Sequence, residues 1–430
     1  MHYFSTNQTS PHVSFRDAVL CGQPDDEGLY FPSEVPKLSA DFFGGLSTMP
    51  NEQIAFDVIR PYVAGEIPDE NLFEICTEAV NFSFPLVEIS ERISVLELFH
   101  GPTLAFKDVG AKFMSRCLKY FSRDQKGKTM VLVATSGDTG GAVAAAFHGV
   151  EGIEVVILYP KGKVSKVQEL QLTTFGGNVT TLELHGTFDD CQALAKQALA
   201  DADLQSRINL TSANSINVAR WLPQQFYYFY ALKQWEGTPP VISVPSGNFG
   251  NLASGFLANA AGLPIEKFIA ACNANDVVPR FMQNEAYEPR PSIATLSNAM
   301  DIGAPSNFIR ILEIFDNKFI DLKEKFEAVS ISDEVTATTM RDVYSQCNYI
   351  LDPHGAVGYR ALADHLETDP NARGIFLETA HPVKFDSVNE VLRTQGNIPA
   401  SISDLLSKEE QSIEVDNDYS QVKDILLSKI

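Results

Sequence analysis

The sequence lacks the signatures of several protein classes. Its six cysteines are scattered over 430 residues, with no Cys-x-x-Cys pair and no Cys/His cluster. This spacing argues against a disulfide framework and a zinc site, so no metal is expected, and it predicts reduced thiols in a cytoplasmic protein. No stretch reaches the ~18 uninterrupted apolar residues of a membrane helix, and the opening MHYFSTNQTSPHVSF has no apolar signal core.

Positive charge is also scarce. The chain has 33 Lys and Arg against 55 Asp and Glu, a net charge of −22. Such a surface repels nucleic-acid phosphates and anionic membranes, so neither is an expected partner. An anionic substrate would therefore need a local basic pocket. No coiled-coil pattern is present, which leaves the choice between a monomer and a homodimer open.

Short apolar runs alternate with helical patterns between about residues 90 and 390. The predicted strands are 130–135, 155–160, 178–184, 241–245, 267–273 and 374–379. Strands rich in Val and Ile, each followed by a helix, predict an α/β fold whose parallel sheet is covered on both faces. Ligands then bind at the carboxyl ends of the strands, in the loops that enter the helices.

Lys107 is the first candidate for chemistry. It lies in LFHGPTLAFKDVGAKFM (98–114), between an apolar approach and a predicted helix. Partly apolar surroundings disfavour the charged ammonium, so the neutral, nucleophilic amine forms more readily, and such an amine can form a Schiff base with an aldehyde. Most lysines are solvated surface groups, and the context alone leaves that alternative open.

Two small-residue loops each follow a predicted strand. In SGNFGN (246–251), glycines permit a close backbone approach, and the following helix N-terminus favours a phosphate; the alternative is a Gly-rich turn without a ligand. In TSGDTGGA (135–142), hydroxyls and backbone N–H groups could hold a carboxylate; the alternative is an ordinary helix N-cap. Asp138 fits an anion site poorly unless it faces a phenol or a hydroxyl.

These segments carry a family resemblance. HGPTLAFKD, TSGDTGGA and SGNFGN, in this order, resemble the tryptophan-synthase-β-like (fold type II) pyridoxal-phosphate enzymes, and their wording is close to that of the threonine synthase family. The resemblance covers almost the whole chain, and it continues through YFSTN (3–7), VSFRDAVLCG (13–22), GLYFP (28–32), SANSINVAR (212–220), LDPHGAVGY (351–359) and ETAHPVKF (378–385). One departure, PDDEGLYFP where the family pattern reads PDGGLYFP, lies outside the expected cofactor site.

The resemblance implies a fold, a domain organisation and a cofactor. Residues 1–80 are expected to form the family's N-terminal domain, 81–395 the catalytic region with a smaller mobile domain inserted at about 110–220, and 396–430 a helical appendage. Lys107 is expected to form a Schiff base with pyridoxal 5′-phosphate, and the Thr379 hydroxyl to face the pyridine nitrogen, where it makes a milder electron sink than a carboxylate would. The cofactor phosphate is expected on the backbone of Gly247, Asn248, Phe249, Gly250 and Asn251.

The resemblance also implies the reaction. The expected substrates are O-phospho-L-homoserine and water, and the products L-threonine and phosphate, formed by γ-elimination and β-hydration. Arg220, whose planar fork suits phosphate oxygens, is the first candidate for the substrate phosphate, although it could instead pair with a structural carboxylate. The expected substrate-binding residues are Thr135, Ser136, Asp138, Thr139, Ser215, Asn217, Arg220 and, as a weaker second cation, Lys112.

Three rival functions are considered. The nearest is another fold type II lyase, a dehydratase or an enzyme that releases 2-oxobutyrate, but the N-terminal segment and ETAHPVKF favour the synthase. A catalytically idle relative would be expected to lose Lys107 or the Gly-rich loop, and both are intact. A phosphate-binding protein without pyridoxal phosphate would lack the yellow colour of the cofactor. Allosteric control is left open by the sequence, and the N-terminal region resembles the shorter type found in unregulated relatives.

Overall fold

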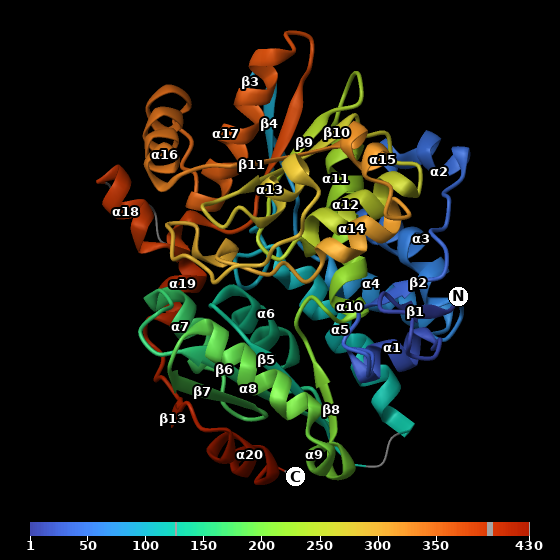
Figure 1. Cartoon of the computed structure of the whole chain (residues 1–430), viewed down its shortest axis with the longest axis vertical. Helices are drawn as coiled ribbons and strands as arrows, with labels where there is room; N and C mark the ends of the chain where they lie inside the picture. The colour runs from blue at the N-terminus through green and yellow to red at the C-terminus, as the bar shows by residue number, and fades with distance from the viewer. Residues whose placement is uncertain (125–126, 394–398, 430) are drawn as a thin grey trace.

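Two sheets, each covered by helices, organise the molecule. The computed structural model describes residues 1–124, 127–393 and 399–429, and in the view of Figure 1 its larger sheet lies above the second. The strand orders are β11-β10-β9-β12-β4-β3 in the larger sheet and β13-β7-β6-β5-β8 in the second. The predicted α/β fold with parallel strands is confirmed; β3, at the edge of the larger sheet, is the antiparallel exception.

The predicted strands all occur, within two residues of their expected bounds. The larger sheet contains β3 (Leu86–Ser90), β4 (Ile93–Glu97), β9 (Val241–Pro245), β10 (Lys267–Cys272), β11 (Phe326–Ser330) and β12 (Gly374–Glu378). The second sheet contains β5 (Thr129–Ala134), β6 (Ile153–Pro160), β7 (Val179–His185), β8 (Asn209–Ser212) and β13 (Ile413–Asp416). A separate antiparallel pair joins β1 (Tyr3–Ser5) to β2 (Tyr30–Pro32).

Helices fill the connections between these strands. The α-helices are α1 (Phe15–Cys21), α2 (Ala40–Gly45), α3 (Asn51–Val63), α4 (Asp69–Ala79), α5 (Lys107–Phe121), α6 (Asp138–Phe147), α7 (Lys166–Thr173), α8 (Phe188–Ala200), α9 (Ala202–Arg207), α10 (Val218–Trp221), α11 (Phe226–Gln234), α12 (Gly250–Ala260), α13 (Val277–Asn284), α14 (Phe308–Ile314), α15 (Phe319–Lys325), α16 (Asp333–Cys347), α17 (Pro353–Thr368), α18 (Asp386–Leu392), α19 (Ala400–Leu405) and α20 (Tyr419–Leu427). Short 3₁₀ turns are η1 (Leu46–Thr48), η2 (Ser122–Asp124), η3 (Leu222–Gln225), η4 (Asn298–Met300) and η5 (Pro382–Lys384). No helix of the described ranges is long and apolar enough to cross a membrane.

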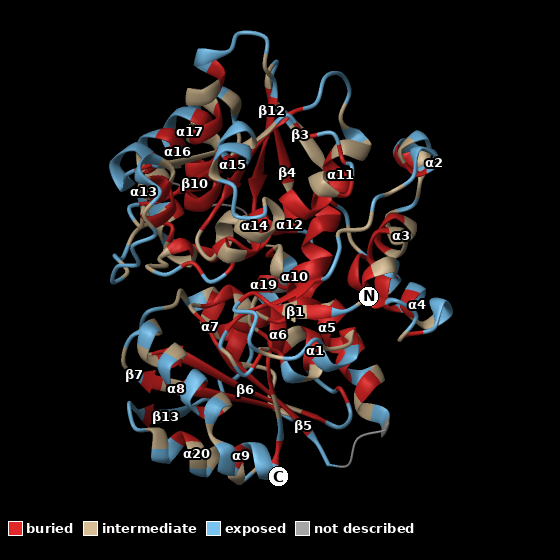
Figure 2. Ribbon diagram, turned by 45° about the vertical axis from the view of Figure 1, so that its right-hand side comes forward, coloured by how far each residue is buried: buried red, intermediate tan, exposed pale blue. Residues whose placement is uncertain are grey.

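The central strands are buried on both faces. Every residue of β5, β9 and β12 is buried, and Figure 2 shows β5 and β12 in the colour of buried residues. Continuous apolar strands of this kind are typical of parallel sheets covered by helices. Each of these strands pairs with a neighbour on both sides, which fixes the positions at which the loops at their carboxyl ends begin.

The carboxyl-terminal segment differs from the expected helical appendage. It contains α19 and α20, but between them β13 pairs in parallel with β7, in a register that places Ile413 beside Leu182. Val422 and Leu426 of α20 are buried in the same apolar cluster as Leu182. The segment is therefore an edge strand and a covering helix of the second sheet, while the expected boundary at 395–396 lies outside the described residues.

Candidate active site

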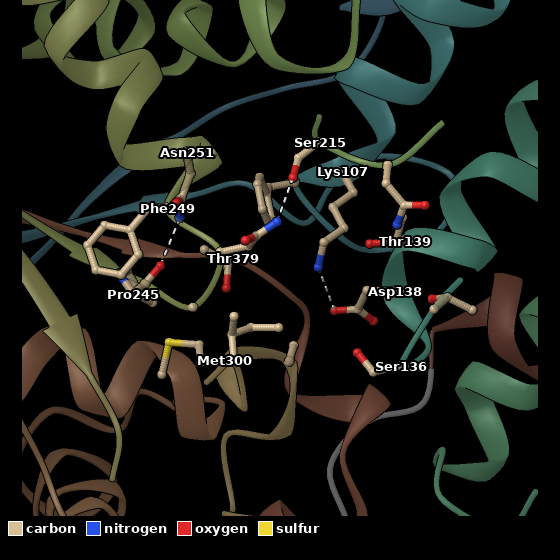
Figure 3. A pocket seen from close by; sticks show the side chains of 18 of the residues that line it. Lys107, Ser136, Asp138, Thr139, Ser215, Pro245, Phe249, Asn251, Met300 and Thr379 are labelled. Atoms are coloured by element: carbon tan, nitrogen blue, oxygen red, sulfur yellow. Dashed lines mark hydrogen bonds and ion pairs between the residues drawn. The ribbon is translucent and has the colours of Figure 1, made fainter. Parts of the chain in front are cut away.

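Loops from both sheets converge on one cleft. It is lined by the start of α5 and by the segments that follow β5, β8, β9 and β12 (Figure 3). Most residues expected from the sequence to bind cofactor or substrate line it: Lys107, Thr135, Ser136, Asp138, Thr139, Ser215, Arg220, Gly247, Asn248, Phe249, Gly250, Asn251 and Thr379. These residues are far apart in the chain, and the carboxyl ends of the strands bring them together.

Two expected residues lie outside the cleft. Asn217 is fully buried and caps α10: its Oδ1 accepts from the N–H of Ala219 at 3.0 Å, and its Nδ2 donates to the carbonyl of Val19 at 2.9 Å. Lys112 lines a separate cavity, with its Nζ 3.9 Å from a carboxylate oxygen of Glu78. Lys112 follows Lys107 by five residues, which on an α-helix turns it away by roughly 140°.

Lys107 is the first residue of α5 and points into the cleft toward Asp138 (Figure 3). Its side chain is 19% exposed, and its Nζ lies 3.9 Å from Oδ2 of Asp138. Burial lowers the pKa of the Lys107 amine; Asp138 opposes this change, while the cations Lys384 and Arg220 add to it. The neutral amine that a nucleophile or a base requires is therefore more accessible than in an ordinary lysine.

A second buried lysine, without an assigned role in the sequence analysis, holds Asp138. Lys384, at the end of η5, is fully buried, and its Nζ donates to Oδ1 of Asp138 at 2.8 Å and to the carbonyl of Thr103 at 2.8 Å. Gln168 also donates to Oδ1 of Asp138, at 3.0 Å. Burial alone would raise the pKa of the Asp138 carboxyl, but Lys384 and Lys107 lower it below its ordinary value. The signal in the sequence was a lysine between apolar residues in HPVKF.

The Gly-rich loop has the form of an anion site. Phe249 adopts the left-handed conformation, with φ of 63°, and α12 begins at the next residue. In the described ranges, no backbone N–H of residues 247–251 has an acceptor. A Cβ added at Gly247 would lie 2.6 Å from the Cα of Met300, so only glycine fits there. Unpaired donors at a helix N-terminus stabilise a phosphate.

The loop after β5 is both a helix N-cap and a set of donors for an anion, the two alternatives considered for it from the sequence. The Thr135 hydroxyl accepts from the N–H groups of Gly137 and Gly140, both at 2.9 Å, and so caps the start of α6. The backbone N–H groups of Ser136, Asp138 and Thr139 have no acceptor in the part of the chain that the structure describes. Thr135 is thus occupied structurally, whereas its neighbours present donors suited to a carboxylate.

Arg220 supplies positive charge to the cleft. Its guanidinium is buried, and its Nε and Nη1 have no hydrogen-bond partner. Burial lowers its pKa to about 10, so it stays cationic at neutral pH. Among the described residues no carboxylate lies within ion-pair distance of its guanidinium, and Asp108 raises its pKa only from farther away, so the structural pairing considered for Arg220 is not formed. A buried, unpaired guanidinium facing a cleft is suited to an anionic ligand.

The residues present fit pyridoxal phosphate. Lys107 offers an amine whose pKa is lowered, and residues 247–251 offer unpaired N–H donors. Thr379 follows β12 and lines the cleft, and its hydroxyl has no partner among the described residues. An aldehyde, a phosphate and a ring nitrogen each have a matching group. Together with the α/β fold, these features define the class of pyridoxal-phosphate-dependent enzymes.

Comparison with known proteins agrees with this class. Residues 41–377 match the family described as pyridoxal-phosphate dependent enzyme, and 355–426 match the C-terminal region of threonine synthases. The chain is 43% identical to the threonine synthase of Haemophilus influenzae, over 99% of this chain and all of that one. The threonine synthase of Escherichia coli is 41% identical over the full length of both chains. The chain therefore belongs to the threonine synthase family.

Solved structures extend the comparison. The crystal structure of E. coli threonine synthase matches with a TM-score of 0.94 at 40% identity, covering all of both chains. A pyridoxal-phosphate-bound threonine synthase from Brucella melitensis matches with a TM-score of 0.93 at 35% identity, covering 100% of this chain and 99% of that one. Maize serine racemase, at 16% identity and a TM-score of 0.57, shares the fold alone; it covers 80% of this chain and 96% of that one.

Proposed function

We propose that this cleft converts O-phospho-L-homoserine and water to L-threonine and phosphate, by γ-elimination followed by β-hydration. The observation that carries the proposal is Arg220, a buried guanidinium with two unpaired nitrogens in the same cleft as Lys107. The only anionic group of an unphosphorylated amino acid is its carboxylate, which the unpaired N–H groups of Ser136, Asp138 and Thr139 can already bind, so Arg220 is left for a second anion. Membership of the threonine synthase family supports the same substrate.

Two groups would hold the cofactor by its ends. Lys107 would bind its aldehyde carbon through Nζ, and the N–H groups of residues 247–251 would bind its phosphate. The Thr379 hydroxyl would orient the ring nitrogen without requiring that it be protonated. Pyridoxal phosphate, when bound, supplies an electron sink that stabilises negative charge at the substrate's α-carbon.

The side chains of the cleft would then position the substrate and move its protons. The N–H groups of Ser136, Asp138 and Thr139 would bind its carboxylate, and Arg220 its phosphate. The Lys107 amine would remove the α-proton and return a proton as threonine forms, which its lowered pKa permits. Arg220 would stabilise the phosphate as the bond to the γ-carbon breaks.

A cytoplasmic location is part of the proposal. All six cysteines are free, and Cys76, Cys117, Cys191 and Cys272 are buried. Unpaired thiols in a protein of this size fit a reducing compartment.

One product analysis tests the proposal. Full-length, cofactor-loaded protein is incubated with O-phospho-L-homoserine, and phosphate, threonine and 2-oxobutyrate are quantified together, with L-homoserine as the matched control. Equal amounts of phosphate and threonine are expected, with no product from homoserine. Phosphate with 2-oxobutyrate would identify the lyase alternative instead, and no phosphate at all would refute the substrate.

A further inference from the structure

A second buried arginine lies beneath the Gly-rich loop. Arg310, on α14, is fully buried, and in the described ranges it forms no ion pair with a carboxylate. Its Nη2 donates to the carbonyls of Ile216 at 2.7 Å and Tyr30 at 3.1 Å. Its guanidinium stacks on Trp221, 4.1 Å from the ring centroid. Every partner of this cation is therefore neutral.

A buried charge without a counter-charge is costly. Removing a cation from water is normally offset by a carboxylate, and this chain has 55 Asp and Glu from which one could have been placed. Burial lowers the pKa of Arg310 to about 9, so the group remains cationic at neutral pH. The position is explained if an anion that binds nearby supplies the missing negative charge.

Hydrogen bonds connect Arg310 to the Gly-rich loop. Its Nη1 donates to Oδ1 of Asn307 at 2.7 Å, which turns the amide nitrogen of Asn307 toward Oγ of Ser215, at 2.9 Å. Asn248, within the loop, donates to the same Oγ at 3.0 Å. Oγ of Ser215 thus accepts two hydrogen bonds, which leaves its own O–H free to donate into the cleft. A Cβ added at Gly250 would lie 3.4 Å from Cβ of Ser215, so the hydroxyl is close to the anion site.

We propose that Arg310 is the counter-charge of the cofactor phosphate and acts on it through Asn307 and Ser215. Arg310 is thus a positioning residue that does not touch the phosphate. Ser215, expected from the sequence to bind substrate, is assigned to the cofactor instead. Each of the two buried arginines without an ion pair is then assigned to one phosphate: Arg220 to the substrate phosphate and Arg310 to the cofactor phosphate. This inference rests on the cofactor site of the proposed function, but not on its substrate.

The test compares pyridoxal phosphate with pyridoxal, which lacks the phosphate. Dissociation constants of both are measured on the full-length apoenzyme by the absorbance of the Schiff base, for wild type, Arg310→Met, Arg310→Lys and Ser215→Ala. Arg207→Met removes an exposed charge that pairs with Asp203 on the surface of α9, and it is the matched control. The ratio of the two dissociation constants reports the contribution of the phosphate group alone, because a general disruption of the site would weaken the binding of both ligands equally.

We expect Arg310→Met to weaken pyridoxal phosphate relative to pyridoxal by about 10- to 100-fold, as for the loss of one charge–charge attraction transmitted through Asn307 and Ser215 at an effective dielectric constant of about 20. Arg310→Lys should keep most of the preference for pyridoxal phosphate over pyridoxal. Ser215→Ala should lose part of this preference, and Arg207→Met should leave it unchanged. Equal weakening of both ligands would show a merely structural arginine and overturn the inference. If Arg310→Met does not fold, an unchanged ratio in Ser215→Ala overturns it as well. Wild type that binds the cofactor but does not turn over O-phospho-L-homoserine would refute the proposed function alone.

Discussion

Replacing Lys384 with methionine should make Lys107 a poorer nucleophile, although the two side chains belong to different segments. Asp138 lies between them, 2.8 Å from Nζ of Lys384 and 3.9 Å from Nζ of Lys107. In the wild type, Lys384 balances the carboxylate and also repels a charge on Lys107. Lys384→Met removes the repulsion and leaves Asp138 with Lys107 as its cation. Both changes favour the ammonium, so the pKa of Lys107 rises.

The distances set the size of the effect. The effect of the substitution is the loss of the repulsion between the two lysines, whose Nζ atoms lie 2.8 and 3.9 Å from different oxygens of Asp138. At an effective dielectric constant of about 20, two like charges roughly 8 Å apart repel by about 2 kcal/mol. Each 1.36 kcal/mol changes the fraction of neutral amine by about a factor of ten. We therefore expect the rate of Schiff-base formation at neutral pH to fall by about 10- to 100-fold.

The assay follows the absorbance of the Schiff base after apoenzyme is mixed with pyridoxal phosphate, over a range of pH. The rate profile of Lys384→Met should move to higher pH, because the neutral amine is populated only above its raised pKa. The double variant Lys384→Met/Asp138→Asn should move it back, and Lys318→Met, at a lysine whose side chain is 62% exposed, should leave it unchanged. A profile of Lys384→Met that coincides with wild type would refute the reasoning.

Three further substitutions test other parts of the cleft. Lys107→Ala should abolish turnover and the Schiff-base absorbance, whereas Lys112→Ala, outside the cleft, should retain both; full activity of the first variant would exclude the mechanism. Arg220→Ala should raise KM for O-phospho-L-homoserine by about 10- to 100-fold with unchanged cofactor affinity, and an unchanged KM would point to another cation. Gly247→Ala would place a Cβ 2.6 Å from a backbone atom and should cost about 1–3 kcal/mol of stability in thermal unfolding, along with cofactor affinity. Gly44→Ala, where a Cβ meets nothing within 4 Å, is its control, and equal effects at both glycines would contradict the steric argument.

Parts of this outcome follow from local sequence. The run VISVP is short, contains β-branched residues and is followed by small turn-forming residues, a combination that favours a buried strand leading through a tight turn into a helix. The predicted strands and the loops at their carboxyl ends were therefore correctly located, and Lys107 stands where its context placed it. The prediction found the helices of the carboxyl-terminal segment but missed the strand Ile413–Asp416, because whether that strand pairs depends on the edge of β7, a feature of a distant segment.

The sequence by itself determined the class of fold, the order of the site segments and the residues most directly exposed to a ligand, because each is set by neighbours along the chain. Only the tertiary structure decided how the charges are distributed. Lys384 meets Asp138, and Arg310 meets the carbonyl of Ser215, across 95 residues in the second case. The tertiary structure also places the Asn217 side chain against the backbone of α10 and the Lys112 side chain outside the cleft. The strength of a charge interaction depends on the distance between the two groups in space and on how far burial removes them from water. Neither the distance nor the burial can be predicted from the spacing of residues along the chain.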